Sequence, residues 1–161
     1  MLVLAAGILL RLAIIDLKTR LLPNVWVGAF ALSGLAFHAL TQMQFISWQS
    51  AVIGILLGGG LLLLIRAAGN FYYKQDTLGL GDVKLMAAAG LWLGQEYILL
   101  ALVCGALAGL VHGFAMMIAH RIKHQEAAQL STFSLPAGPG FIVGIVIGAL
   151  AKFGGLDHLL F

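Results

Sequence analysis

The sequence predicts an all-α fold, a polytopic transmembrane bundle of about six helices, and three observations support this prediction. Hydrophobic residues make up 61% of the 161 residues, and the mean hydropathy is +1.04. Only 9% of the residues are charged, whereas a soluble domain carries about 25%. The apolar residues form continuous runs without the two-residue alternation of membrane β-strands. Together these features exclude a soluble globular domain, a disordered chain and a coiled coil.

Apolar runs separated by polar breaks define the predicted helices. A span needs about 20 residues, so the chain has room for five or six crossings and almost no domain outside the membrane. No linker divides the chain, which predicts a single membrane-embedded domain over residues 1–161. The predicted helices cover residues 2–15, 25–40, 51–67, 83–93, 98–119 and 141–153.

The first three helices are bounded by clear signals. The first is apolar from Met1, with no basic segment ahead of it and no small-residue cleavage site, which favours a membrane span over a signal peptide. It meets the polar break 16–24, in which Pro23 ends this helix or begins the second. The third helix lies between the polar breaks 41–50 and 68–82. The first helix is short for a full crossing, so its polar flank extends it or it enters only part of the bilayer.

The last three helices are bounded by the short break 94–97 and the long break 120–140. The fourth helix, which opens after Asp82, is also short for a full crossing. Small residues within these spans allow neighbouring helices to approach closely. We expect such packing at Gly54, Gly58, Gly59, Gly60, Gly105 and Gly109.

Basic residues alternate between the breaks and predict the topology. The first, third and fifth breaks contain or adjoin Lys and Arg, whereas the second and fourth contain neither. By the positive-inside rule, the first, third and fifth breaks face the cytoplasm and both termini lie outside. The basic residues concerned are Lys18, Arg20, Arg66, Lys74, Lys84, Arg121 and Lys123.

The cysteine content argues against metal and disulfide chemistry. The single cysteine, Cys104, lies inside an apolar run and is predicted to be a small buried residue. It cannot form an intrachain disulfide, and no CxxC pair is present for zinc or redox chemistry. We therefore predict no metal site and no organic cofactor, and we expect no nucleic-acid partner.

Two of the six acids, Asp16 and Asp82, lie where a polar break meets an apolar helix. Asp16 alone could form a helix-end ion pair with Arg20, four residues later. Asp82 alone could be the N-cap of the helix that follows it. The glycines before Asp82 lack the spacing of a phosphate-binding loop, so nucleotide binding is not predicted. The other four acids are interpreted as solvated surface charges.

Taken together, the two aspartates predict more. Both are expected on the same membrane side and at similar depth, where two neighbouring carboxyl groups cannot both ionise and share a proton. One could then act as a base toward water while the other polarises a carbonyl group. Gly79 and Gly81 would permit positive φ angles and close approach of a substrate backbone. Lys84 is predicted to extend to the membrane interface, with substrate contact as a second interpretation.

Three stretches resemble the type IV prepilin peptidases, which are intramembrane aspartyl proteases of the Gly-x-Gly-Asp class. They occur in the family's order and span nearly the whole chain. The stretches are Asp16 with Pro23-Asn24, then Gly79-Leu-Gly-Asp-Val-Lys-Leu-Met86, and finally Leu135-Pro-Ala-Gly-Pro139.

The resemblance implies an aspartic endopeptidase of the type IV pilus or protein-secretion machinery. Asp16 and Asp82 would be its catalytic pair, with the roles of base and acid unassigned. Its partners would be prepilin or pseudopilin substrates, cleaved after a glycine at the end of a short basic leader, and the lipid bilayer. The protein would lie in the bacterial inner membrane with several passes and its active site toward the cytoplasm.

The sequence differs from the family pattern in one respect, and two functions other than peptidase are also considered. Bifunctional members carry paired CxxC motifs associated with N-methylation, whereas this chain has one cysteine, so methyltransferase activity is not expected. The chief alternative is a small proton- or cation-coupled membrane transporter in which both aspartates bind cations. A structural subunit of a secretion assembly, with both aspartates as helix caps, is the third hypothesis.

Overall fold

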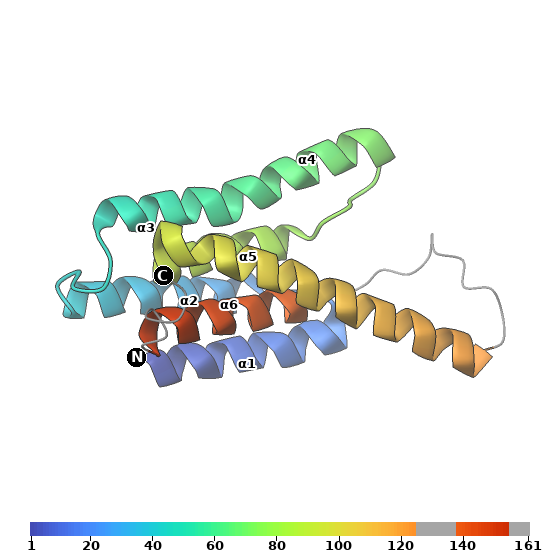
Figure 1. The fold of residues 1–161 in the computed structure, drawn as a ribbon, viewed down its shortest axis with the longest axis horizontal. Coiled ribbons are helices and arrows are strands. Elements are labelled where there is room, and N and C mark those ends of the chain that lie inside the picture. Colours follow the sequence, from blue (N-terminus) through green and yellow to red (C-terminus); the bar gives the residue numbers. More distant parts are fainter. Residues whose placement is uncertain (125–137, 155–161) are drawn as a thin grey trace.

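The structure is a computed structural model that describes residues 1–124 and 138–154, and within these ranges it contains helices and no strands (Figure 1). This arrangement confirms the predicted all-α fold. The elements are α1 (Leu2–Thr19), α2 (Asn24–Leu40), α3 (Trp48–Ile55), the π-helical turn η1 (Leu56–Gly60), α4 (Leu61–Tyr73), α5 (Leu80–His124) and α6 (Gly138–Phe153).

The helices differ from the prediction in extent and in number. α3, η1 and α4 follow one another without a break, so the third predicted helix extends at both ends to cover 48–73. The predicted fourth and fifth helices are one element, α5, which is interrupted only at Gly94. The described residues therefore form five continuous helical segments, of which α5 consists of two helical arms joined at Gly94, where we predicted about six helices.

α5 reverses direction at Gly94, which has φ 74° and ψ −176°. Met86 and Ile98 are twelve residues apart and would be about 18 Å apart along a straight helix. Both nevertheless lie against Gly58. Figure 1 shows the chain turning back at this point. Positive φ angles are readily available only to glycine, so Gly94 allows a first arm (residues 80–93) and a second arm (residues 95–124) to pack side by side.

Side chains from other helices bind the carbonyl groups that the reversal leaves without helical partners. Such groups are costly in an apolar environment. His38 of α2 is fully buried and donates from Nε2 to the Leu91 carbonyl over 3.0 Å. Lys152 of α6 donates from Nζ to the Leu93 carbonyl over 2.9 Å. A cation at a helix C-terminus also interacts favourably with the helix dipole, so two polar side chains stabilise the end of the first arm.

Close helix packing depends on glycine, as the sequence predicts. Gly54 of α3 and Gly90 of α5 face one another, and a Cβ at either position would strike the other's carbonyl oxygen. A Cβ at Gly60, in contrast, would meet no atom within 4 Å, so the prediction of close packing is wrong at this position. The remaining close contacts involve Gly58, Gly59 and Gly105. A Cβ at Gly109 would also meet no atom within 4 Å, although a Cβ at Gly140 would strike the Gly109 backbone, so the predicted site of close packing lies at Gly140 instead.

The crossing of Gly54 and Gly90 provides a test of the packing. We expect Gly54→Ala to destabilise the protein by about 2 kcal/mol, because the added methyl group forces two helix backbones apart. Gly60→Ala is the matched control in the same continuous helix, and it should leave stability unchanged or raise it by up to about 1 kcal/mol. Thermal unfolding in detergent measures both changes. Equal stability of the two variants would contradict the packing described here.

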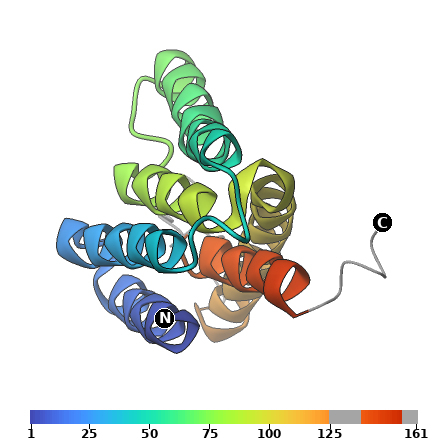
Figure 2. The same cartoon turned by 90° about the vertical axis from the view of Figure 1, so that its left-hand side faces the viewer.

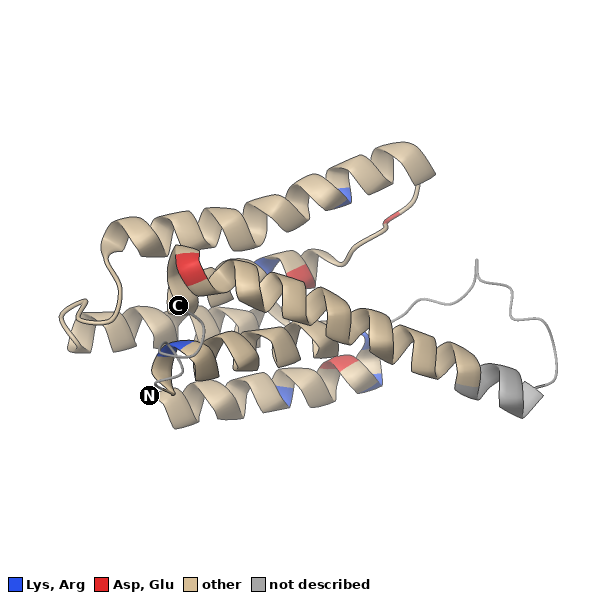
Figure 3. Ribbon diagram, viewed as in Figure 1, with Lys and Arg blue, Asp and Glu red and all other residues tan. Residues whose placement is uncertain are grey.

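The helices have the length and surface of a membrane bundle. Two described helices, Trp48–Tyr73 and Leu80–Ile118, are long and apolar enough to cross a membrane, and the second includes the reversal at Gly94. Their outer faces carry exposed apolar side chains, among them Phe71 at 88% exposure. Figure 3 shows how few charged positions interrupt the described helices. Such a surface matches lipid better than water.

The described breaks between the helices lie at the two ends of the bundle. At one end, the break after α1 meets the loop before α5, with Leu22 against Gly81. At the other end, Ser50 of α3 accepts a hydrogen bond from the Gln95 N–H beyond the reversal. The first and third breaks thus lie at one end and the second and fourth at the other, while most of the fifth break, 120–140, lies outside the described residues. Which end faces the cytoplasm stays a prediction. Figure 2 looks along the helices and shows the rod formed by α3, η1 and α4 on the side of the bundle away from α1.

Candidate active site

Asp16 lies in the last turn of α1, which continues to Thr19 and so ends later than the predicted boundary at residue 15. The helix ends at Arg20, a left-handed residue whose N–H donates to the Asp16 carbonyl. The Asp16 side chain is only 4% exposed and forms no salt bridge with Arg20. The structure therefore does not support the helix-end ion pair as an explanation for this carboxylate.

Asp82 is the third residue of α5 and is 7% exposed. Its carboxylate folds back toward the preceding loop, where a Cβ on Gly79 would stand 3.0 Å from Asp82 Oδ2. No described residue donates a hydrogen bond to this carboxylate. The side chain is therefore not a simple helix cap, because a cap would accept a backbone N–H at the helix start.

Gly138, the first residue of α6, lies against both carboxylates. A Cβ there would stand 2.5 Å from Asp16 Oδ2 and 3.4 Å from Asp82 Oδ1. The separation of these two oxygens therefore cannot exceed the sum of these distances. The Gly138 N–H is directed to the Asp16 carboxylate, while Asp16 Oδ2 is buried and has no hydrogen-bond partner among the described residues. Three helix ends thus bring together two acids that are 66 positions apart in the chain.

This arrangement has the chemistry expected of a coupled acid pair. Two neighbouring carboxyl groups with little access to water repel one another when both are ionised, so they are most stable with one shared proton. In that state one group can accept a proton while the other donates one. Because Gly138 has no side chain, the space beside both oxygens is not filled by a Cβ.

Gly79 and Gly81 have different surroundings, and Gly94 is the one described glycine with a positive φ. The expectation that Gly79 and Gly81 use positive φ angles is therefore wrong. Gly81 lies against Leu22, whose Cβ is 2.8 Å from the position that a Gly81 Cβ would take. Its lack of a side chain lets α5 begin beside the link between α1 and α2. Gly79 is exposed and lies beside the Asp82 carboxylate.

Lys84 donates from Nζ to Asn24 Oδ1 over 3.0 Å. Asn24 is the first residue of α2 and follows Pro23, so this bond links the starts of α2 and α5. Both residues belong to stretches that the sequence singles out, yet the sequence does not predict that they meet. The observed contact fits a residue that positions helices.

Two further features of the site escaped prediction. Gly138 belongs to the stretch that resembles the Pro-x-Gly-Pro segment, and this resemblance is the signal that could have identified it. Arg66 and Asp76 form a salt bridge beside the loop that leads to Gly79; Asp76 is a surface charge as predicted, 77% exposed, but its partner was not predicted. In the part of the chain that the structure describes, no three His, Cys, Asp or Glu side chains are placed to hold a metal ion.

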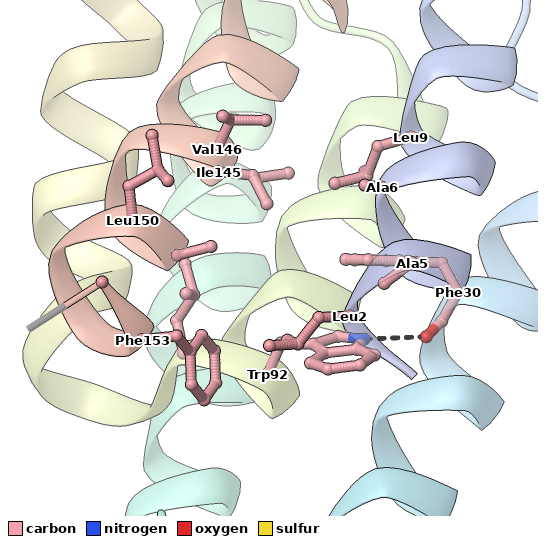
Figure 4. A pocket seen from close by; sticks show the side chains of 13 residues that line it. Leu2, Ala5, Ala6, Leu9, Phe30, Trp92, Ile145, Val146, Leu150 and Phe153 are labelled. Carbon is pink, nitrogen blue, oxygen red and sulfur yellow. Dashed lines mark hydrogen bonds between the residues drawn. The ribbon is translucent and has the colours of Figure 1, made fainter.

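An apolar cavity of about 320 Å³ lies between α1 and α6 at the end away from the aspartates (Figure 4). Trp92 forms part of its wall and donates from Nε1 to the Phe30 carbonyl over 2.9 Å. No acid, base or nucleophile lines this cavity, so it is not a candidate for the reaction. Its other labelled residues in Figure 4 are Leu2, Ala5, Ala6, Leu9, Ile145, Val146, Leu150 and Phe153.

Comparison with known proteins gives a consistent result. Residues 3–114 match the type IV leader peptidase family. The chain is 32% identical over 152 residues to a prepilin leader peptidase/N-methyltransferase of Dickeya chrysanthemi, covering 94% of the chain and 51% of that protein. It is 33% identical over 142 residues to the protein of this name from Pectobacterium carotovorum subsp. carotovorum, covering 88% and 48%.

The protein of this name from Escherichia coli strain K12 is 32% identical over 138 residues, which cover 86% of the chain and 57% of that relative. The chain thus spans about half the length of the curated relatives it matches. No solved structure matches the chain at a significant level.

Proposed function

The chain belongs to the type IV leader peptidase family, and from this we propose that it is an intramembrane aspartic endopeptidase. Its substrates would be type IV prepilins or pseudopilins, whose leader peptide it removes at the cytoplasmic face of the membrane. The observation that carries this proposal is the placement of Asp16 and Asp82 around Gly138 at one end of the bundle.

Peptide hydrolysis follows from a pair of carboxyl groups that hold one proton. The ionised group takes a proton from a water molecule, whose oxygen attacks the scissile carbonyl carbon while the protonated group donates to the carbonyl oxygen. Collapse of the tetrahedral intermediate then breaks the C–N bond, and the departing amine takes up a proton. Asp16 and Asp82 would share these roles, and a coupled pair titrates as a unit.

The position of the pair supports a peptidase over a carrier. Asp16 lies in the last turn of α1 and Asp82 in the first turn of α5. A transport site is typically built near the middle of the bilayer, where discontinuous helices bind the cargo. At helix ends, in contrast, the acids lie next to polar breaks, the side from which water and an extended peptide segment would approach them.

The loop before α5 would meet the substrate backbone at Gly79, which is exposed beside the Asp82 carboxylate. The Gly79 carbonyl accepts the Val83 N–H, and the Leu78 carbonyl accepts a bond from Arg66. Pairing with a substrate would therefore use backbone groups of this loop other than these two carbonyls. Gly81 and Lys84 would act mainly by holding α5 against α2, with substrate contact by Lys84 as a further possibility.

The cytoplasmic location of the site is part of the proposal and is supported by charge. Lys18 and Arg20 follow Asp16, and Lys84 follows Asp82, so the end of the bundle with the acids is basic. By the positive-inside rule this end would face the cytoplasm of a bacterial inner-membrane protein with several passes. We propose the peptidase activity alone. The relatives' names also include an N-methyltransferase, and we do not extend that activity to this chain.

Cleavage of a co-expressed substrate tests the proposal. We expect the full chain to convert a prepilin or pseudopilin to a faster-migrating form, and mass spectrometry should place the cut after the glycine that ends the basic leader. A prepilin with this glycine replaced by a bulky residue is the matched substrate control and should stay uncut. If the well-expressed protein cleaves no prepilin and instead supports proton-coupled uptake in vesicles, the transporter alternative is correct.

A further inference from the structure

The loop that leads to Asp82, residues 74–79, is fastened to α4 by side chains. The Arg66 guanidinium donates both to the Leu78 carbonyl and to the Asp76 carboxylate. One residue of α4 thus holds two positions of the loop at once. Figure 3 shows the basic position on α4 and the acidic position on the loop that follows it.

Asn70 adds a second set of contacts to the same loop. Its carbonyl oxygen accepts the Thr77 N–H over 2.9 Å and the Thr77 hydroxyl over 3.1 Å. Its amide nitrogen donates to Asp76 Oδ1 over 3.0 Å. Together, Arg66 and Asn70 contact three consecutive loop residues, Asp76, Thr77 and Leu78.

The residues of α4 that make these contacts lie on one face of the helix. Residues 66, 69 and 70 have the i, i+3 and i+4 spacing that places side chains side by side. A Cβ on Gly69 would strike the Thr77 hydroxyl, so the absence of a side chain there lets the loop lie directly against α4. We call Arg66, Gly69 and Asn70 the α4 clamp.

The charge and burial of the α4 clamp suit a fixed position. The Arg66 side chain is 14% exposed, whereas that of Asp76 is 77% exposed. A planar guanidinium can bind two acceptors with fixed geometry, which a lysine ammonium does less well. Beyond the clamp, α4 ends in the strongly exposed side chains of Phe71, Tyr72 and Tyr73.

The α4 clamp acts on the residue next to the candidate active site. Leu78 precedes Gly79, whose carbonyl accepts the Val83 N–H in the first turn of α5. The position of Leu78 therefore sets where α5 begins and, through the first turn, where the Asp82 carboxylate lies relative to Asp16. We propose that Arg66 is a positioning residue of the peptidase that acts through Leu78 on Asp82, an inference that rests on the proposed function.

Prepilin cleavage by full-length variants tests this role. We expect Arg66→Ala to lower the cleavage rate by about 100-fold, since misplacement by about 1 Å can cost that much. Arg66→Lys keeps the charge but loses the two-point contact, so we expect an intermediate rate. Lys74→Gln removes a charge from the same loop, and the Lys74 side chain forms no hydrogen bond or ion pair with the described residues, so the rate should be unchanged. A full rate for Arg66→Ala overturns the proposal.

A covalent tether separates positioning from direct chemistry by Arg66. The position of a Gly69 Cβ is 3.1 Å from the Thr77 Cβ, so the exposed loop must move outward by a few tenths of an ångström to reach the range of about 3.5–4.5 Å found in disulfides. Both proteins compared carry Gly69→Cys, Thr77→Cys and Cys104→Ala and are oxidised to form the disulfide. One of them also carries Arg66→Ala, and we expect its cleavage rate to lie within about tenfold of the rate of the one that keeps Arg66. A reducing agent should abolish the rescue. A folded, fully crosslinked protein that stays inactive contradicts a positioning role.

The rate of crosslinking tests the clamp without any substrate. With added oxidant, the Gly69→Cys, Thr77→Cys pair should form its disulfide faster when Arg66 is present than in Arg66→Ala, because the clamp holds the two positions together. Equal rates overturn the proposal. If the unmodified protein cleaves no prepilin while the rates differ, the proposed function is wrong and the clamp is supported.

Discussion

Asp16→Asn and Asp82→Asn are each expected to lower prepilin cleavage by at least about 1,000-fold, the upper part of the range for general acid–base catalysis. Asparagine keeps the size and shape of the side chain, but its amide group neither accepts nor releases a proton near neutral pH. A quantitative cleavage assay with purified protein in detergent measures the loss. The rate of the unmodified protein should pass through a maximum with pH, because only the singly protonated pair is active.

The fold should survive both substitutions. Each carboxyl group is buried near the other, and a neutral amide of the same size lets the remaining carboxyl group titrate without a charged neighbour, so the unfolding temperature should stay the same or rise. Glu96→Gln is the matched control, since it neutralises an exposed acid at the opposite end of the bundle, and it should cleave normally. If cleavage persists in both aspartate variants, the acid-pair mechanism is wrong.

The second large effect is expected at Gly138. The methyl group of Gly138→Ala would stand 2.5 Å from Asp16 Oδ2 and 3.4 Å from Asp82 Oδ1, so α6 or the carboxyl groups must move. We expect cleavage to fall by about 100-fold, in line with the cost of displacing reacting groups by about 1 Å. The loss should appear mainly in kcat, because the substitution disturbs the reacting groups.

Gly7→Ala in α1 is the matched control for Gly138→Ala. A Cβ at Gly7 meets no atom within 4 Å, so this variant should cleave normally and gain up to about 1 kcal/mol of stability from the better helix former. A normal cleavage rate for a stably folded Gly138→Ala would show that the space between the carboxylates is not needed. A global loss of fold would appear as a lower unfolding temperature, which distinguishes it from the local effect.

The helices were largely predictable because their signals are local. Hydropathy and polar breaks located the described helical segments, and the first and third breaks lie at the same end of the bundle. The region around Gly94 differs in one respect: the short break was predicted as a loop of four residues, whereas a single non-helical residue, Gly94, separates the two helical arms of α5. His38 and Lys152 stabilise that turn from α2 and α6, and no local pattern predicts contacts between residues so far apart.

The candidate site was predictable in its residue types and much less so in its geometry. Asp16 and Asp82 stood out because ionisable groups are rare in apolar helices. Lys84, in contrast, was considered for substrate contact, and its observed partner is Asn24, sixty residues earlier. Asp76 is the exposed surface charge that the sequence predicts, but its partner Arg66 could not be foreseen, because Arg66 approaches only once the loop folds onto α4.

From the sequence alone follow the membrane class, the helical architecture and the two acids worth testing. Each depends on the hydropathy or charge of neighbouring residues, which the chain carries into any fold. The tertiary structure alone decides that Asp16 and Asp82 meet beside Gly138, and that Arg66 holds the loop before Asp82. These contacts arise because glycine-mediated helix packing sets the relative height of α1, α5 and α6, and small differences in that packing would separate the same residues.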